Sequence, residues 1–166
     1  TTKKGLGMSP KRITVSTAGI SKMIKKLGDD GVRFNLAISL HSANDSKRDI
    51  LMPINQKINL NELRESIRYF YDKTGSRVTY EYILFKDLND SIDDAQKLTQ
   101  FVKASPCKIN LIEYNIVDDL PYEKSSNKVT ERFITYLEKR NIIANLRKSK
   151  GKDINAACGQ LVNKLK

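Results

Sequence analysis

Short apolar and β-branched runs alternate along the chain with longer segments in which apolar residues recur at helical spacing. The clearest run is residues 34–40, whose mostly apolar character is typical of a strand buried on both faces of a parallel sheet. The intervening segments are long enough for helical crossovers, which parallel pairing requires. We therefore predict an α/β protein, built as a barrel or as a doubly wound sheet. The predicted strands are residues 12–16, 34–40, 78–84, 108–115 and 142–146.

The number of strand–helix units bears on which of these two architectures applies. A closed eight-unit barrel typically needs about 250 residues, whereas this chain has 166 residues and four or five predicted units. Either the sheet is open or further strands lie upstream of Thr1. Since the chain does not begin with Met, we expect it to be part of a larger protein.

Glycines and small polar residues mark the expected helix boundaries. Gly28 is expected to end the first helix and Gly75 the long helix that follows the second strand. Asp90 or Ser91 can cap the next helix. The remaining expectations are a short helix over residues 46–51 that Pro53 ends, a core stripe of Ile92, Ala95, Leu98 and Val102, and a cap at Asn127 for the last helix.

Composition excludes several classes of protein. Hydrophobic residues make up 39% of the chain, which is too many for a disordered protein. No apolar run approaches the roughly 20 residues of a membrane span, and no signal peptide is visible. Cys107 and Cys158 form neither a disulfide framework nor a zinc or iron–sulfur pattern, and we interpret Cys107 as structural. We therefore expect a cytoplasmic protein without membrane contact.

The net charge is +11, and the pI is about 9.6. Such a balance favours a polyanionic partner, with nucleic acid as the first candidate. A basic segment near the end of the chain could bind RNA phosphates without reading the base sequence. The alternative is an ordinary solvated face. The candidate residues are Arg147, Lys148, Lys150 and Lys152.

Polar side chains follow the predicted strands, where α/β proteins form their sites. These are Ser16, the sequence Ser39-Leu40-His41, Asn115 and Arg147. Hydroxyl, amide and imidazole groups at one edge suit a polar, ribose-bearing ligand, although no glycine-rich phosphate loop is present. His41 is either a general base or a hydrogen-bonded structural histidine.

Glu81 points inward, into the barrel, if its strand alternates. It is then either an active-site carboxylate or an internal salt-bridge partner.

Cys158 lies between Ala157 and Gly159, so little bulk shields its sulfur, and a run of Lys and Arg precedes it. Cations lower the pKa of a thiol and make it a better nucleophile. The same cysteine also lies on an apolar helical stripe, as inert core cysteines do. The residues alone therefore leave both interpretations open.

The string Asp-Ile-Asn-Ala-Ala-Cys-Gly-Gln-Leu, residues 153–161, resembles the C-terminal signature of the RlmN/Cfr family of radical S-adenosylmethionine (SAM) RNA methyltransferases. Further segments resemble the same family in the same order. The family's Cys-x3-Cys-x2-Cys cluster motif, its Gly-Glu-Pro segment and its N-terminal RNA-engaging domain have no counterpart here, and its Trp-Asn-Pro is Tyr114-Asn115-Ile116. The similar segments are residues 12–19, 36–41, 48–55, 78–82 and 107–112.

The resemblance implies a partial radical-SAM (β/α) barrel in which residues 1–166 are the C-terminal part of the core domain, ending in a helix that carries Cys158. It makes Cys158 the methyl carrier and assigns no metal ligand to this chain. Its further implications are methylation of adenine C2 in large-subunit ribosomal RNA and in tRNA, a four-iron four-sulfur cluster held elsewhere in the full-length protein, and a reducing electron donor. The SAM contacts that it implies are Ser16, Ser39, Leu40, His41 and Asn115.

The resemblance also implies that the methyl group passes from SAM to the cysteine and then to the RNA, because the aromatic C2 carbon is not nucleophilic and cannot take the methyl group from SAM directly. One SAM methylates the carrier thiolate, and a second SAM, cleaved at the reduced cluster, generates the radical that activates the methyl group. Without the cluster ligands, we expect the chain alone to be inactive. The alternatives are a non-catalytic basic RNA-binding α/β module, a C8-methylating enzyme of the Cfr type, and a metabolic enzyme with a small phosphorylated substrate. Exposed sheet edges also make self-association an expectation.

Overall fold

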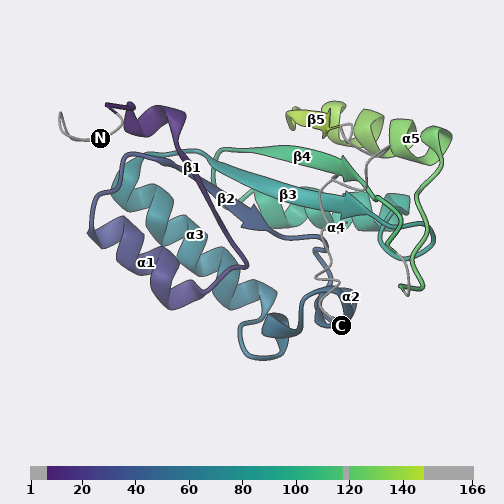
Figure 1. The fold of residues 1–166 in the computed structure, drawn as a ribbon, viewed down its shortest axis with the longest axis horizontal. Coiled ribbons are helices and arrows are strands. Elements are labelled where there is room, and N and C mark those ends of the chain that lie inside the picture. The colour runs from purple at the N-terminus through teal and green to yellow at the C-terminus, as the bar shows by residue number, and fades with distance from the viewer. Residues whose placement is uncertain (1–6, 118–119, 148–166) are drawn as a thin grey trace, which may run out of the picture.

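The computed structural model describes residues 7–117 and 120–147. Its centre is a five-stranded sheet in which every neighbouring pair is parallel and the strands follow one another in chain order (Figure 1). This order confirms the predicted α/β architecture with parallel strands and helical crossovers. The strands are β1 (Thr14–Thr17), β2 (Asn35–Ser39), β3 (Val78–Leu84), β4 (Cys107–Glu113) and β5 (Ala144–Arg147).

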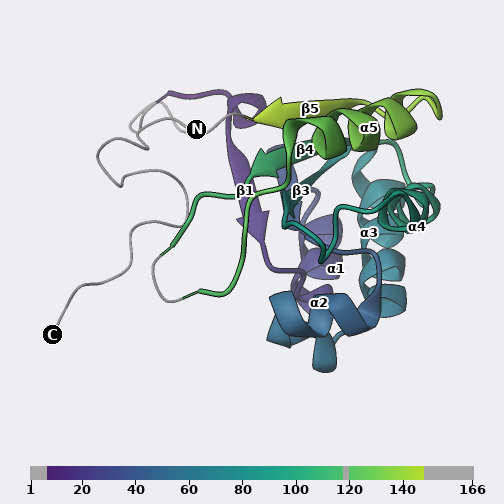
Figure 2. The same cartoon turned by 90° about the vertical axis from the view of Figure 1, so that its right-hand side faces the viewer.

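Four longer helices connect the strands and cover one face of the curved sheet, as Figure 2 shows from the side. Successive crossovers on the same side of a parallel sheet are the arrangement found in β/α barrels. The helices are α1 (Ser21–Asp29), α3 (Leu60–Thr74), α4 (Ile92–Val102) and α5 (Asn127–Glu138), with the shorter α2 (Asp45–Leu51) and the 3-10 turns η1 (Pro10–Arg12) and η2 (Pro53–Gln56). No helix in the described part of the chain is long and apolar enough to cross a membrane.

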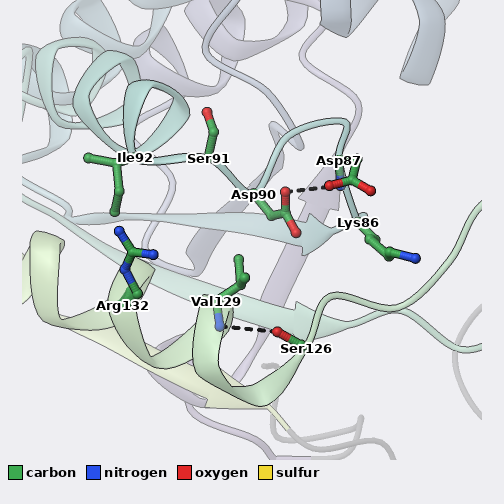
Figure 3. A pocket seen from close by; sticks show the side chains of 8 residues that line it. All are labelled: Lys86, Asp87, Asp90, Ser91, Ile92, Ser126, Val129 and Arg132. Atoms are coloured by element: carbon green, nitrogen blue, oxygen red, sulfur yellow. Dashed lines mark hydrogen bonds between the residues drawn. The ribbon is translucent and has the colours of Figure 1, made fainter.

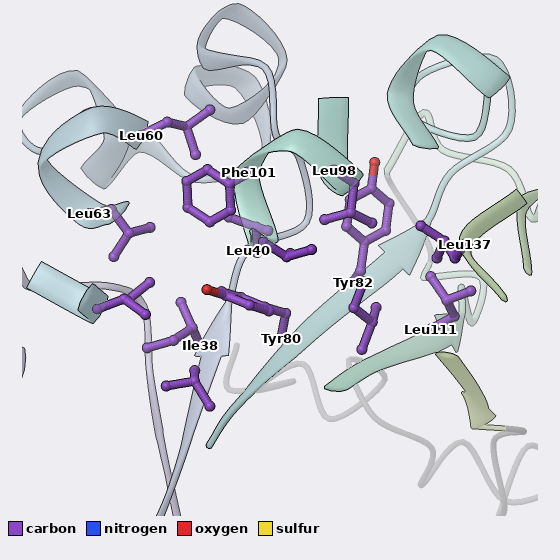
Figure 4. Close-up of a cluster of buried hydrophobic side chains, with 14 of the residues drawn as sticks. Ile38, Leu40, Leu60, Leu63, Tyr80, Tyr82, Leu98, Phe101, Leu111 and Leu137 are labelled. Atoms are coloured by element: carbon purple, nitrogen blue, oxygen red, sulfur yellow. The ribbon is translucent and has the colours of Figure 1, made fainter. Parts of the chain in front are cut away.

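Alternate residues of the strands form the core with these helices. Tyr80 and Tyr82 of β3 are fully buried. The Tyr80 ring meets Phe101 of α4 at a centroid distance of 5.8 Å (Figure 4), and the Tyr82 ring meets Phe133 of α5 at 5.6 Å. Such tilted and edge-on contacts are the favourable geometries for aromatic pairs. The neighbouring strands add Leu36, Ile38, Ile109 and Leu111, all fully buried.

Several predicted boundaries are confirmed. Gly75 ends α3 in the left-handed conformation, with φ of 63°. Ser91 caps α4 and forms a capping box with Asp94, in which each side chain accepts from the other residue's backbone N–H.

Three details of the helix prediction are wrong. Gly28 lies inside α1, where a Cβ atom would be 3.3 Å from the Cα of Phe70, so this glycine allows α1 and α3 to approach closely. Ile92 is 36% exposed rather than part of the core. Ser126, not Asn127, caps α5 by accepting from the N–H of Val129 at 3.3 Å.

Candidate functional site

The face of the sheet opposite the helices is polar. Because Ile38, Tyr80 and Ile109 face the helices, the residues that follow them face the other way. The parallel register sets these residues side by side, with Ser39 next to Glu81 and Glu81 next to Asn110, and Asn145 of β5 continues the row. This row, residues 39, 81, 110 and 145, is called the polar row below. It confirms that Glu81 points away from the helical layer.

Glu81 occupies the centre of the polar row. Asn110 Nδ2 donates a hydrogen bond to Glu81 Oε1 at 2.8 Å. Arg147, at the end of β5, has its Nη1 atom 3.9 Å from Glu81 Oε2. The carboxylate therefore has the salt-bridge partner expected for one of its two interpretations. Its Oε2 atom is nevertheless buried without a hydrogen-bond partner among the described residues.

His41 follows β2 with a φ of 56°, a left-handed conformation that histidine tolerates better than most residues. Its Nδ1 atom accepts a hydrogen bond from the N–H of Ile83 at 3.1 Å. Burial, and then the nearby Arg48 guanidinium, lower the pKa of His41 to about 4. The ring is therefore neutral at pH 7 and a poor general base there. This geometry favours the structural interpretation of His41 and leaves its Nε2 as a donor.

Arg48 of α2 ties together the segments that follow β1 and β2. Its side chain is almost fully buried at 1% exposure. The guanidinium donates to the carbonyl oxygens of Ala18 at 2.9 Å, Ser39 at 3.3 Å and Leu40 at 3.2 Å, and to Asn55 Oδ1 at 2.8 Å. One side chain thus fixes the backbone of two predicted site residues, Ser39 and Leu40, and of the segment that follows β1.

Two carboxylates bind Asn55, the side-chain partner of Arg48. Asn55 Nδ2 donates to Asp45 Oδ1 at 2.9 Å and to Asp49 Oδ1 at 2.7 Å. Burial lowers the pKa of Arg48, while the charges of these two aspartates raise it. Residue type and spacing do not predict this role, since Arg48 stands in a short polar helix as an exposed arginine would.

Asn89 performs the same task for the segments after β2 and β3. Its side chain is fully buried. Its Nδ2 atom donates to the carbonyls of His41 at 2.6 Å and Ile83 at 2.8 Å, and its Oδ1 accepts from the N–H of Phe85 at 2.7 Å. These bonds hold the His41 backbone in place at the carboxyl edge of the sheet.

Asp90 extends this chain of clamps to the segment after β4. Its Oδ2 accepts from the hydroxyl of Ser125 at 2.7 Å, and its Oδ1 accepts from the N–H of Asp87 at 3.1 Å. The segments after β1 to β4 are thus joined by side chains, which makes the carboxyl edge a rigid support for a ligand.

The structure places the predicted SAM contacts at this edge but in different environments. Ser16 is exposed on β1, paired in register with Ala37, and Ser39 ends β2. The Leu40 side chain lies in the core, so Leu40 can meet a ligand only through its backbone. Asn115 is buried, two residues beyond the end of β4.

Arg147 ends β5 at the same edge and is exposed. Lys148, Lys150, Lys152 and Cys158 lie outside the described residues, so their predicted roles stay predictions.

A hollow of about 400 Å³ lies between the N-terminal ends of α4 and α5 (Figure 3). Its described lining includes two carboxylates and two cations, and the predicted site residues are not among them. This hollow is therefore separate from the polar row. The lining residues are Lys86, Asp87, Asp90, Ser91, Ile92, Ser126, Val129 and Arg132.

Comparison with known proteins finds close relatives, although no family model matches the chain. It is 53% identical over 164 residues to a probable dual-specificity RNA methyltransferase RlmN of Christiangramia forsetii, a match that covers 99% of this chain and 47% of the relative. It is 41% identical over 160 residues to the dual-specificity RNA methyltransferase RlmN of Nautilia profundicola, covering 96% of this chain and 45% of the relative.

Solved structures agree with this result. A radical SAM methyltransferase from Sphaerobacter thermophilus superimposes with a TM-score of 0.92 at 38% identity, over 96% of this chain and 47% of that one. A domain of pyruvate-formate lyase-activating enzyme from Bacteroides vulgatus, at 16% identity and a TM-score of 0.63, shares the fold over 83% of this chain. The chain spans about half the length of the curated relatives it matches, and over that span its relatives are named RlmN dual-specificity RNA methyltransferases and its structural neighbour a radical SAM methyltransferase.

Proposed function

We propose that the protein containing this chain methylates adenine C2 in large-subunit ribosomal RNA and in tRNA, with SAM as the methyl donor and Cys158 as the methyl carrier. The observation that carries this proposal is the family match, which extends over 99% of the chain at 53% identity. We further propose that it works in the cytoplasm with a reducing electron donor.

The polar groups at the carboxyl edge fit SAM. Its ribose and adenine need hydroxyl and amide partners, and its amino groups need acceptors. Ser16 and Ser39 offer hydroxyls, and Glu81 Oε2 is a buried acceptor without a hydrogen-bond partner in the described residues. When bound, SAM would supply the methyl group, and a four-iron four-sulfur cluster, whose cysteine triplet is absent from this sequence, would supply an electron.

The site residues then have distinct tasks. We assign Ser16, Ser39 and Asn115 to hydrogen bonds with SAM. His41 accepts from Ile83 through Nδ1, so its neutral ring carries the proton on Nε2 and can donate to the ligand. Leu40 acts through its backbone, which Arg48 holds in place.

The remaining assignments concern the methyl carrier and the RNA. Cys158 would act as a thiolate nucleophile, activated by the cations that precede it in the sequence. Arg147, together with Lys148, Lys150 and Lys152, would contact RNA phosphates and position the substrate.

Peptide mass spectrometry on the full-length, cluster-loaded protein tests the carrier role. We expect the peptide with Cys158 to carry one extra methyl group on sulfur. We also expect Cys158→Ala to abolish 2-methyladenosine formation while SAM cleavage continues.

The matched control is Cys107→Ala. Burial raises the pKa of the Cys107 thiol to about 11, so this thiol stays protonated and unreactive, and its removal should leave methylation intact. An unmodified Cys158 in cluster-loaded protein given SAM would contradict the proposal and favour a non-catalytic RNA-binding module. A methyl group at C8 instead of C2 would assign the protein to the Cfr branch.

A further inference from the structure

The two carboxylate oxygens of Glu81 have different surroundings. Oε1 accepts a hydrogen bond from Asn110 Nδ2 at 2.8 Å, which fixes the orientation of the carboxylate. Oε2 is buried and has no hydrogen-bond partner in the described part of the chain. A buried acceptor without a donor is costly, and more so when it belongs to a charged group. A working protein is therefore expected to provide a donor at Oε2.

Arg147 does not fill this need in the structure. Its Nη1 atom is 3.9 Å from Oε2, which is beyond hydrogen-bond distance. The Arg147 side chain is also 64% exposed, against 15% for Glu81, so water screens most of the guanidinium charge. The pair contributes attraction but leaves the hydrogen-bonding capacity of Oε2 unused.

The position of Glu81 indicates where the donor comes from. Glu81 is the register partner of Ser39, so the two side chains stand next to each other on the face without helices. Ser39 is one of the residues assigned to SAM, and its backbone carbonyl is held by Arg48. A ligand that contacts the Ser39 hydroxyl therefore lies beside Glu81.

We propose that Glu81 is a further ligand-binding residue of this site and accepts a hydrogen bond from SAM through Oε2. This inference rests on the proposed function, because it requires SAM at the carboxyl edge. SAM carries suitable donors on its ribose, its adenine and its ammonium group, and its positive sulfonium complements the carboxylate charge. Glu81 is thus both a salt-bridge partner and a binding carboxylate.

The test is SAM affinity, measured by equilibrium dialysis with labelled SAM on the full-length, cluster-loaded protein. Glu81→Gln keeps an oxygen for Asn110 but presents an amide N–H₂ to the donor of the ligand. Because a hydrogen bond to a charged group is stronger than a neutral one, we expect its loss to lower the affinity for SAM by about tenfold or more. The same measurement with 5′-methylthioadenosine locates the donor, since this compound has the ribose and adenine but lacks the ammonium group.

Glu65→Gln is the matched control. Glu65 lies exposed on α3 and also accepts from an asparagine amide, Asn61 Nδ2, at 3.2 Å. It makes the same change in charge far from the polar row and should leave SAM affinity unchanged. Glu81→Asp is the second variant, since it keeps the charge but withdraws the carboxylate by one methylene. It should weaken SAM binding at an unchanged melting temperature, and it decides the question if Glu81→Gln does not fold.

The outcomes separate the two proposals. Weaker binding of both compounds supports a contact with the nucleoside, and weaker binding of SAM alone supports a contact with the cationic methionine end, which the neutral analogue lacks. Unchanged affinity for SAM in folded Glu81 variants overturns the inference and leaves the proposed function intact, with Oε2 then satisfied by another part of the full-length protein. Failure of the unmodified, cluster-loaded protein to bind SAM overturns both.

Discussion

The two faces of the sheet are built from alternate residues of the same strands but differ in chemistry. On the helical face of β3 and β4, Tyr80, Tyr82 and Leu111 are fully buried among apolar neighbours. On the opposite face, the residues next to them include Glu81 and Asn110, which bond to each other.

The helical face contributes stability, because removal of apolar surface from water is worth about 25 cal/mol per Å². The face without helices, called the open face below, carries fewer large apolar side chains, and the partly unsatisfied Glu81 carboxylate on it costs free energy. Local arrangements that work against stability are expected where a protein binds or reacts. The comparison therefore assigns folding to one face and function to the other.

The largest expected effect concerns the edge at which the two faces meet. Arg48→Met removes the guanidinium that binds three backbone carbonyls and Asn55, and it leaves Asp45 and Asp49 without their buried counter-charge. Each buried acceptor left without its donor costs about 1–3 kcal/mol, so we expect a loss of more than about 3 kcal/mol for these four acceptors together. Urea denaturation of the 166-residue chain, followed by far-UV circular dichroism, measures this loss. A change below about 1 kcal/mol, the range of exposed residues, would show that Arg48 does not hold together the segments that follow β1 and β2.

The next prediction compares two neighbours in one strand. Leu111 of β4 is fully buried against the helices, whereas Ile112 lies on the open face and is only partly buried. Leu111→Ala is expected to cost about 2–5 kcal/mol, because it leaves a cavity in the core. Ile112→Ala should cost clearly less, since its surroundings are less densely packed. Equal losses in urea denaturation would mean that the open face contributes to folding as much as the helical face does.

The sequence predicted the helical face well because that face follows from periodicity. Apolar alternation in residues 78–84 located β3 and also placed Glu81 on the other side, as the structure confirms. Gly28 was misassigned as a helix end, because its role depends on the approach of Phe70, which lies far away in the sequence.

The site was predictable only in part. The rule that parallel strands end at one edge brought Ser16, Ser39 and His41 together, and the structure places all three there. The side chains that hold these residues in place, Arg48 and Asn89, could not be predicted from the sequence. Their burial results from bonds to backbone atoms of distant segments. Side-chain type and spacing carry no information about such bonds.

The smallest expected effect is a pH dependence at the edge of the open face. The folded pKa of His41 is about 4, below the unfolded value of 6.5, because burial and the Arg48 charge disfavour the protonated ring. A depressed folded pKa means that the stability contributed by neutral His41 is present above pH 6.5 and is lost as the pH falls toward 4. Between pH 7 and pH 5 the loss should be about 2 kcal/mol. Since His41 is the only histidine, His41→Asn, which also tolerates a positive φ, should remove this dependence from urea denaturation curves. If the variant retained the pH dependence of the free energy of unfolding, His41 would not be the buried neutral group that accepts from the N–H of Ile83. The carboxyl edge of the sheet would then be more accessible to water than the burial of His41 implies.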